Sequence, residues 1–169
     1  MPSLLRRILA PFRPTNGRVP APKTAARGSA PRNAVETVEV DPRRVPRLTL
    51  RYAPAFDGTP DAGEVVWTWV PFAERDGRGK DRPVLVIAAI DEARAYAVKL
   101  TSRSHDGDRE YLSIGPGPWD SAGRPSWVDL DQLYIVHADG MRREAAALDR
   151  ARYATVAGEL ARRYGWRVV

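Results

Sequence analysis

The chain has no cysteine and only two histidines, His105 and His137, among its 169 residues. Without cysteine, neither disulfide bonds nor thiolate metal sites can form, and two histidines cannot supply an all-histidine zinc site. No apolar run approaches the roughly 18 residues that a membrane-spanning helix requires. We therefore expect a cytoplasmic protein with one ordinary domain and a tail, using no metal or other cofactor.

Positive charge is concentrated near the N-terminus. Residues 1–62 hold 11 Lys and Arg against 5 Asp and Glu, whereas residues 63–169 hold 16 of each, so the first segment carries the whole net charge of +6. Residues 10–34 are rich in Pro, Arg, Ala, Gly and Ser, a composition typical of disorder. We predict a basic, largely disordered leader at residues 1–61 and a folded domain at residues 62–169.

Short apolar segments separated by turn-forming residues make up most of the domain. Strands are predicted at Glu64–Pro71, Pro83–Ile90, Ala95–Thr101, Glu110–Ile114, Trp127–Leu130 and Gln132–Val136. In the leader, the alternating segments Val35–Val40 and Leu48–Tyr52 are each a short strand or an extended arm on the domain surface. This spacing is typical of a mainly β fold, either a small barrel or a sandwich.

The periodicity changes near the C-terminus. Apolar residues from Tyr153 to Tyr164 recur at helical spacing, with Asp149 as a predicted N-cap and Gly165 at the predicted end. We therefore expect one C-terminal helix that packs on one side of the β domain.

The stretch from Gly63 to Ile87 carries the clearest binding signal. An apolar strand leads through a charged, glycine-containing loop to Arg82, at the edge of the next apolar strand. A guanidinium is permanently charged, and its planar fork can bind two phosphoryl oxygens at once. Arg82 is therefore a candidate anion-binding residue. The alternative interpretation is that Arg82 only forms an ion pair with Asp81 or Asp129.

Four motifs, in order, resemble the MazF/PemK family of bacterial ribonuclease toxins from type II toxin–antitoxin systems. They are Gly63-Glu-Val-Val-Trp67, Gly79-Lys-Asp-Arg-Pro-Val-Leu-Val-Ile87, Lys99-Leu-Thr-Ser102 and Ser126-Trp-Val-Asp-Leu-Asp-Gln132. The resemblance implies an SH3-like small barrel with a C-terminal helix, working as a homodimer. It also implies metal-independent cleavage of single-stranded RNA, an antitoxin protein as inhibitor, and DNA contact only through that antitoxin.

The same resemblance implies three catalytic residues, Arg82, Thr101 and the adjacent Ser102. In metal-independent cleavage the 2′-OH of RNA attacks the neighbouring phosphate, and an arginine can stabilise the charge that gathers on the phosphoryl oxygens. The Thr101 hydroxyl is not a base near neutral pH, but it can bind a phosphoryl oxygen or orient the 2′-OH. Alternatively, Thr101 is only a strand-end residue with high β propensity.

Other side chains near these motifs are candidates for binding RNA. Arg78, Lys80 and Arg103 are expected to bind backbone phosphates without reading sequence, or else to form a solvated rim. Trp119 lies in a loop rich in Gly and Pro, where it can stack on an unpaired base or on a partner subunit. His105 is a candidate general acid or base, with a solvated loop histidine as the alternative.

A second function class fits the same features. Because a fold can persist after its chemistry is lost, the chain can also be a non-catalytic SH3-like module that binds nucleic acid or protein. The long basic leader favours this alternative.

Overall fold

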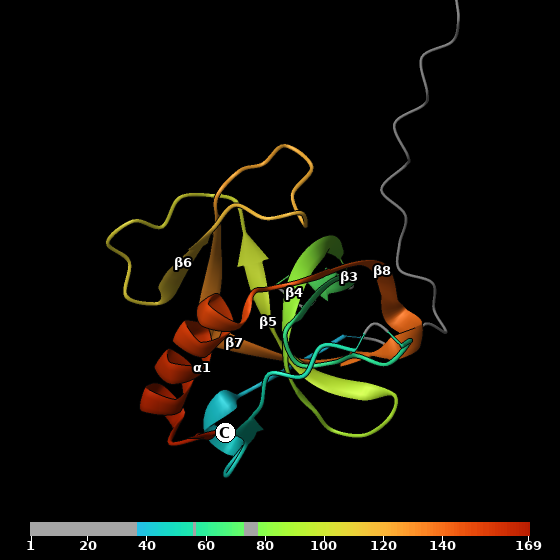
Figure 1. Ribbon diagram of the computed structural model, residues 1–169, viewed down its shortest axis with the longest axis vertical. Coiled ribbons are helices and arrows are strands. Elements are labelled where there is room, and N and C mark those ends of the chain that lie inside the picture. Colours follow the sequence, from blue (N-terminus) through green and yellow to red (C-terminus); the bar gives the residue numbers. More distant parts are fainter. Residues whose placement is uncertain (1–36, 56, 73–77) are drawn as a thin grey trace, which may run out of the picture.

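The computed structural model describes residues 37–55, 57–72 and 78–169, and its main feature is one antiparallel sheet (Figure 1). The strands are β1 (Val38–Val40), β3 (Glu64–Pro71), β4 (Gly79–Ala89), β5 (Arg94–Thr101), β6 (Tyr111–Gly115), β7 (Ser126–His137) and β8 (Met141–Ala147). Their order is β1-β7-β5-β4-β3-β8, and β6 also pairs with β7.

The remaining elements are short, apart from one helix. They are the 3-10 turns η1 (Pro42–Arg44) and η2 (Ala138–Gly140), the helix α1 (Arg150–Tyr164), and the strands β2 (Thr49–Leu50) and β9 (Arg167–Val168), which pair in parallel. No helix in the described part of the chain is long and apolar enough to cross a membrane.

The sheet is not closed into a barrel. Register shifts interrupt the β3–β8, β4–β5, β5–β7 and β6–β7 pairings, and such bulges bend strands and increase their twist. The hydroxyls of Thr37 and Thr68 lie 2.8 Å apart, which links the start of β1 to β3. Among the described residues, however, no ladder joins the edge strands β1 and β8. The mainly β fold with a C-terminal helix is confirmed, and the predicted SH3-like small barrel is corrected to an open sheet.

Both faces of the sheet carry apolar clusters, because neighbouring residues of a strand point to opposite sides. Leu85 and Ile87 of β4 pack with α1, whereas Val84 and Val86 pack on the other face. We call the first cluster the helix-side core; it includes Leu50, Leu85, Ile87, Val98, Leu100, Ile114, Trp119, Val128, Leu148, Tyr153 and Leu160. The second is the opposite-face core, comprising Val66, Val70, Val84, Val86, Ala95, Ala97, Tyr134, Val136 and Met141.

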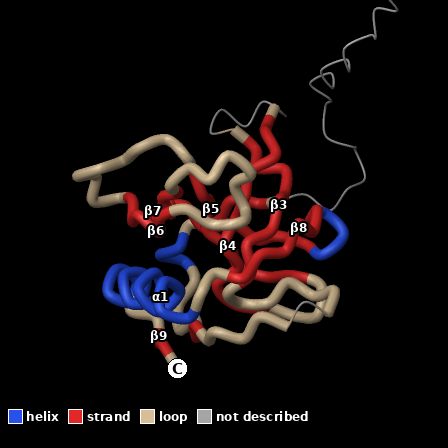
Figure 2. Tube along the Cα trace, turned by 45° about the horizontal axis from the view of Figure 1, so that its top comes forward, coloured by secondary structure: helices blue, strands red, loops and turns tan. Residues whose placement is uncertain are grey.

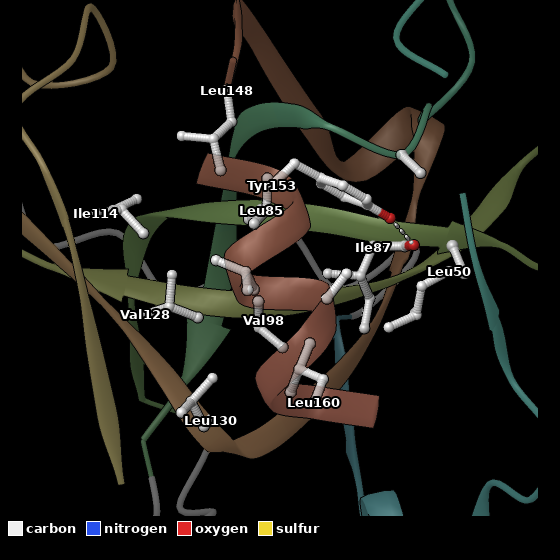
Figure 3. Packing of buried hydrophobic residues seen from close by; sticks show 14 of the residues in the cluster. Leu50, Leu85, Ile87, Val98, Ile114, Val128, Leu130, Leu148, Tyr153 and Leu160 are labelled. Atoms are coloured by element: carbon white, nitrogen blue, oxygen red, sulfur yellow. Dashed lines mark hydrogen bonds between the residues drawn. The ribbon is translucent and has the colours of Figure 1, made fainter. Parts of the chain in front are cut away.

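Helix α1 lies on one side of the sheet (Figure 2), and its buried residues belong to the helix-side core. The Asp149 side chain accepts a hydrogen bond from the Arg152 backbone N–H at 2.9 Å, and Gly165 ends the helix with φ of 71°. Both predicted helix ends are therefore confirmed. The buried Tyr153 hydroxyl donates to the Ile87 carbonyl oxygen at 2.8 Å, which ties the helix to β4 (Figure 3).

The strand predictions need three corrections. The two strands expected at Trp127–Leu130 and Gln132–Val136 form the single strand β7. Strand β4 begins at Gly79 rather than Pro83, because the polar residues before Pro83 continue the hairpin with β3. Strand β8 was not predicted; its polar first half (Met141-Arg-Arg-Glu144) pairs only with β3 at the sheet edge.

Residues 1–36 of the predicted leader lie outside the described residues, but its described part packs on the domain. Leu50 is fully buried in the helix-side core. The Trp166 indole donates to the Val45 carbonyl oxygen, and the Tyr52 hydroxyl donates to the Leu148 carbonyl oxygen, each at 2.8 Å. The division of the chain at residue 62 stays a prediction, whereas this described segment is held by both the C-terminal strand and the loop before α1.

Candidate functional site

The strand pair β3–β4 positions Arg82. The register places Arg82 opposite Thr68, and strand alternation puts it on the same face as Val84, above the opposite-face core. At this position Arg82 lines a small pocket with a volume of about 100 Å³. The pocket is lined by Glu39, Val70, Pro71, Phe72, Arg82, Lys99, Gln132 and Tyr134.

The guanidinium of Arg82 is available to a ligand. Among the described residues, no side chain forms an ion pair or hydrogen bond with it. Asp81 instead forms an ion pair with Arg142 at 2.6 Å, and Asp129 forms one with Lys99 at 3.2 Å. The two carboxylates of the alternative interpretation are therefore occupied elsewhere, which leaves the half-buried Arg82 facing the pocket.

Lys99 brings a second cation to the pocket. Its Nζ lies 3.2 Å from Asp129 Oδ2 and donates a hydrogen bond to Gln132 Oε1. The Tyr134 hydroxyl donates to the same amide oxygen at 2.9 Å. An ammonium has three N–H donors, so one donor of Lys99 remains for a bound group after the Asp129 and Gln132 contacts.

Two tyrosines beside these cations stay protonated. Burial raises the pKa of Tyr134, the carboxylates of Glu39 and Asp129 raise it further, and Arg82 opposes them. Burial also raises the pKa of Tyr111 to about 12, together with the charge of Asp129 and a hydrogen bond to it. Neither phenol is therefore a base near neutral pH, although both can donate hydrogen bonds.

Thr101 lies at the same end of the sheet as Arg82. The β4–β5 ladder ends with the pair Val84 and Lys99, and Arg82 and Thr101 each lie two residues beyond that pair on their own strands. Thr101 Oγ1 accepts a hydrogen bond from the Arg103 backbone N–H at 3.2 Å, and Thr101 is not among the residues that line the pocket. Ser102 follows the strand and is exposed.

The other predicted basic residues are exposed and are not among the residues that line the pocket. Arg78 and Lys80 are exposed at the start of β4, and Lys80 is opposite Val70, a pocket residue. Arg103 is exposed in the loop after β5.

Trp119 does not form an exposed stacking surface, contrary to the sequence prediction. Only 3% of it is exposed, it belongs to the helix-side core, and its indole N–H donates to Ser126 Oγ at 3.0 Å. Gly117 makes this possible, since a Cβ at that position would lie 2.1 Å from the Trp119 ring. The Gly- and Pro-rich loop folds back over its own tryptophan.

His105 lies outside the pocket. Its ring stacks on Tyr111, with 3.5 Å between the ring centroids, and its Nδ1 lies 3.4 Å from Asp108 Oδ2. It reaches the pocket only indirectly, through Tyr111, Asp129 and Lys99. A direct acid or base role for His105 therefore has no geometric support.

Four polar pocket residues were not among the sequence candidates: Glu39, Lys99, Gln132 and Tyr134. Lys99 had a readable signal, because it is the only charged residue within the otherwise apolar segment Ala95–Thr101. Glu39 is distant in sequence and reaches the pocket only through the β1–β7 pairing. Among the described residues there is no group of three or more His, Asp or Glu side chains placed to hold a metal ion.

Comparisons with known proteins agree with the motif resemblance. The profile of the family described as "PemK-like, MazF-like toxin of type II toxin-antitoxin system" matches residues 61–163. No curated protein matches the chain significantly.

Similar solved structures include MazE–MazF (Form-II) from Deinococcus radiodurans, with 24% identity, a TM-score of 0.45, and coverage of 63% of this chain and 96% of that chain. An endoribonuclease from Mycobacterial species has 16% identity, a TM-score of 0.45 and coverage of 63% and 93%. Mycobacterium tuberculosis toxin MazF-mt6 has 13% identity, a TM-score of 0.42 and coverage of 60% and 97%.

Proposed function

The chain belongs to the PemK-like, MazF-like toxin family of type II toxin–antitoxin systems, and on this premise we propose that it is a metal-independent endoribonuclease. Its substrate is single-stranded RNA. The 2′-OH attacks the adjacent phosphorus, the bond to the 5′-oxygen breaks, and the products carry a 2′,3′-cyclic phosphate and a 5′-OH.

The observation that carries this proposal is the pocket shared by Arg82 and Lys99. A phosphodiester gathers negative charge on its non-bridging oxygens as the 2′-oxygen attacks. A planar guanidinium can donate to two such oxygens, and the ammonium of Lys99 adds a point charge from the neighbouring strand. Both groups are mounted on paired strands, β4 and β5, which fix their positions before the substrate arrives.

Thr101 and Ser102 are proposed to assist at the end of β5. The Thr101 hydroxyl is expected to donate to a phosphoryl oxygen or to orient the 2′-OH, because Thr101 and Arg82 both lie just beyond the same end of the β4–β5 ladder. Arg78, Lys80 and Arg103 are proposed to bind phosphates on either side of the cleaved bond. Such contacts position the RNA without specifying its sequence.

The family membership also supports proposals about partners. We expect an antitoxin protein that inhibits the enzyme, a homodimer as the working form, a cytoplasmic location, and DNA contact only through the antitoxin. Light scattering on the purified chain measures its oligomeric state. Growth arrest on induced expression, relieved by a co-expressed antitoxin from the neighbouring gene, tests the inhibition.

The central experiment is incubation of the purified protein with long single-stranded RNA in EDTA, followed by mapping of the new ends. We expect 2′,3′-cyclic phosphate and 5′-OH ends, and loss of cleavage in Arg82→Ala. The matched control is Arg94→Ala, which removes an exposed arginine at the end of β5 away from Thr101 and should cleave normally.

Two results would contradict the proposal. Cleavage that vanishes with EDTA, or that leaves 3′-OH ends, would indicate different chemistry. RNA binding without cleavage of any long RNA would favour the non-catalytic binding module. In that case Arg82→Ala should weaken binding while no RNA ends appear.

A further inference from the structure

A carboxylate from outside the family-matched region lies in the Arg82 pocket. The family match begins at residue 61, whereas Glu39 belongs to β1, which precedes it. Strand β1 pairs with β7 and sets Glu39 directly opposite Tyr134. As a result Glu39 lines the pocket together with Arg82, Lys99 and Gln132.

The proposed cleavage needs a group that accepts the proton of the 2′-OH, and most nearby side chains are unsuited to this. Tyr134 and Tyr111 keep their protons, because burial and the nearby carboxylates raise the pKa of each phenol. Asp129 is held in its ion pair with Lys99, and His105 is stacked on Tyr111 outside the pocket. Among the described carboxylates, Glu39 alone lines the pocket.

We propose that Glu39 is the general base of the reaction, an inference that rests on the proposed endoribonuclease function. The Glu39 carboxylate takes the 2′-OH proton as the 2′-oxygen forms its bond to phosphorus. The bond from phosphorus to the 5′-oxygen breaks, and the 5′-oxygen takes a proton from water. The resulting hydroxide is neutralised by the proton on Glu39, so no other reactant is consumed.

The surroundings of Glu39 suit this role. It is half-buried, and the ladder from Val38 to Val40 and the Thr37–Thr68 hydrogen bond hold its strand in place. The charged and titratable groups that share the pocket are Arg82 of β4, Lys99 of β5 and Tyr134 of β7. Arg82 and Lys99, which share the pocket with Glu39, are proposed to bind the phosphate, and this brings the 2′-OH towards Glu39.

The test measures single-turnover RNA cleavage from acidic to alkaline pH for the wild type, Glu39→Gln, Glu39→Asp and the control Glu92→Gln. Glu92 is exposed in the turn between β4 and β5, so its substitution makes the same charge change away from the pocket. Binding to 2′-O-methyl RNA, which lacks the transferred proton, is measured in parallel. Far-UV circular dichroism and thermal unfolding report whether each variant is folded.

Glu39→Gln is expected to cleave about 10²–10⁴-fold more slowly. If Glu39 is the base, the wild-type rate rises with pH in the acidic range, and Glu39→Gln should lose this rise. Its binding to 2′-O-methyl RNA should be unchanged or tighter, since one negative charge is gone. Glu39→Asp should keep part of the rate and the acidic rise, and it keeps the test decisive if Glu39→Gln does not fold. Glu92→Gln should match the wild type.

Three outcomes would overturn the inference. A folded Glu39→Gln that cleaves at the wild-type rate with the same pH profile would exclude the base role and leave the endoribonuclease proposal intact. Faster cleavage by this variant would show that Glu39 competes with the phosphate for the cations. A wild-type protein that cuts no RNA would remove the proposed function, and the base role with it.

Discussion

The two faces of the sheet use neighbouring residues of the same strands for different purposes. On β4, Leu85 and Ile87 join the helix-side core, whereas Val84, Val86 and Arg82 point the other way. The first face is covered by α1 and anchored by the Tyr153 hydroxyl (Figure 3). The second face carries the opposite-face core, and the charged pocket lies at one end of this face.

This difference indicates that the face under α1 mainly stabilises the fold, whereas the other face carries the proposed reaction site. Burial of large apolar side chains under α1 supplies most of the hydrophobic stabilisation, since this term follows the apolar area removed from water. A fixed sheet can then hold half-buried charges on its other face. Variants on the two faces should therefore fail in different ways, and the comparison can be tested one face at a time.

Removing Trp119 should have the largest effect on stability. Trp119→Ala leaves a large cavity in the helix-side core and is expected to cost about 3–5 kcal/mol of unfolding free energy. Trp119→Phe keeps much of the packing but loses the hydrogen bond to Ser126, and should cost less. Urea unfolding measures both. A stable Trp119→Ala variant that binds RNA poorly would instead support the interpretation that Trp119 stacks on an RNA base.

The burial of Trp119 is also a feature that could not be predicted from the sequence. Local signals identified α1, because Asp149 and Gly165 lie at its two ends, and the strand Glu64–Pro71, because nearly all its residues are apolar. Arg82 was found because it adjoins such a strand. A loop rich in Gly and Pro gives no local sign of its direction, so the inward turn of Trp119 could not be read.

The polar half of the pocket was hidden for a similar reason. Glu39 comes close to Arg82 only because β1 adds to the edge of β7, almost a hundred residues later in the chain. A three-residue strand carries too little pattern to predict its pairing partner. The sequence also could not show whether the sheet closes into a barrel, because closure depends on how bulges such as that between Val86 and Ala88 bend the sheet.

On the pocket face, Asp129→Asn should be the most destabilising of the conservative changes. It removes the partner of Lys99 while leaving that ammonium largely buried, since only 18% of the Lys99 side chain is exposed. We expect a loss of about 1–3 kcal/mol, less than for a fully buried pair. Asp91→Asn is the control, because Asp91 forms an exposed ion pair with Arg94 and its loss should leave unfolding in urea unchanged.

The attachment of the N-terminal segment should contribute less. Tyr52→Phe removes the hydroxyl that donates to the Leu148 carbonyl oxygen and is expected to cost about 1 kcal/mol. Tyr96→Phe is the matched control, because the Tyr96 hydroxyl makes no hydrogen bond among the described residues. Equal unfolding midpoints for the two variants would show that the Tyr52 contact does not stabilise the domain.

The effect expected to be smallest at neutral pH is a pH dependence at Tyr111, which pairs with Asp129 in the β6–β7 ladder. The pKa of Tyr111 is raised from its ordinary 10.0 to about 12, mainly by burial and then by Asp129. The unfolded chain therefore loses this proton first, and stability should fall as the pH rises from about 10 to about 12. Tyr111→Phe should flatten this part of the stability curve; an unchanged slope would contradict the assignment.

The most direct test measures RNA cleavage and unfolding on the same samples of Arg82→Ala and Leu160→Ala. Arg82→Ala should cleave about 10²–10³-fold more slowly yet unfold like the wild type. Leu160→Ala, in the helix-side core, should lose about 2–5 kcal/mol of stability yet cleave normally at temperatures where it is folded. Normal cleavage by Arg82→Ala, or a loss explained by its unfolding, would contradict the assignment of the pocket as the site of cleavage.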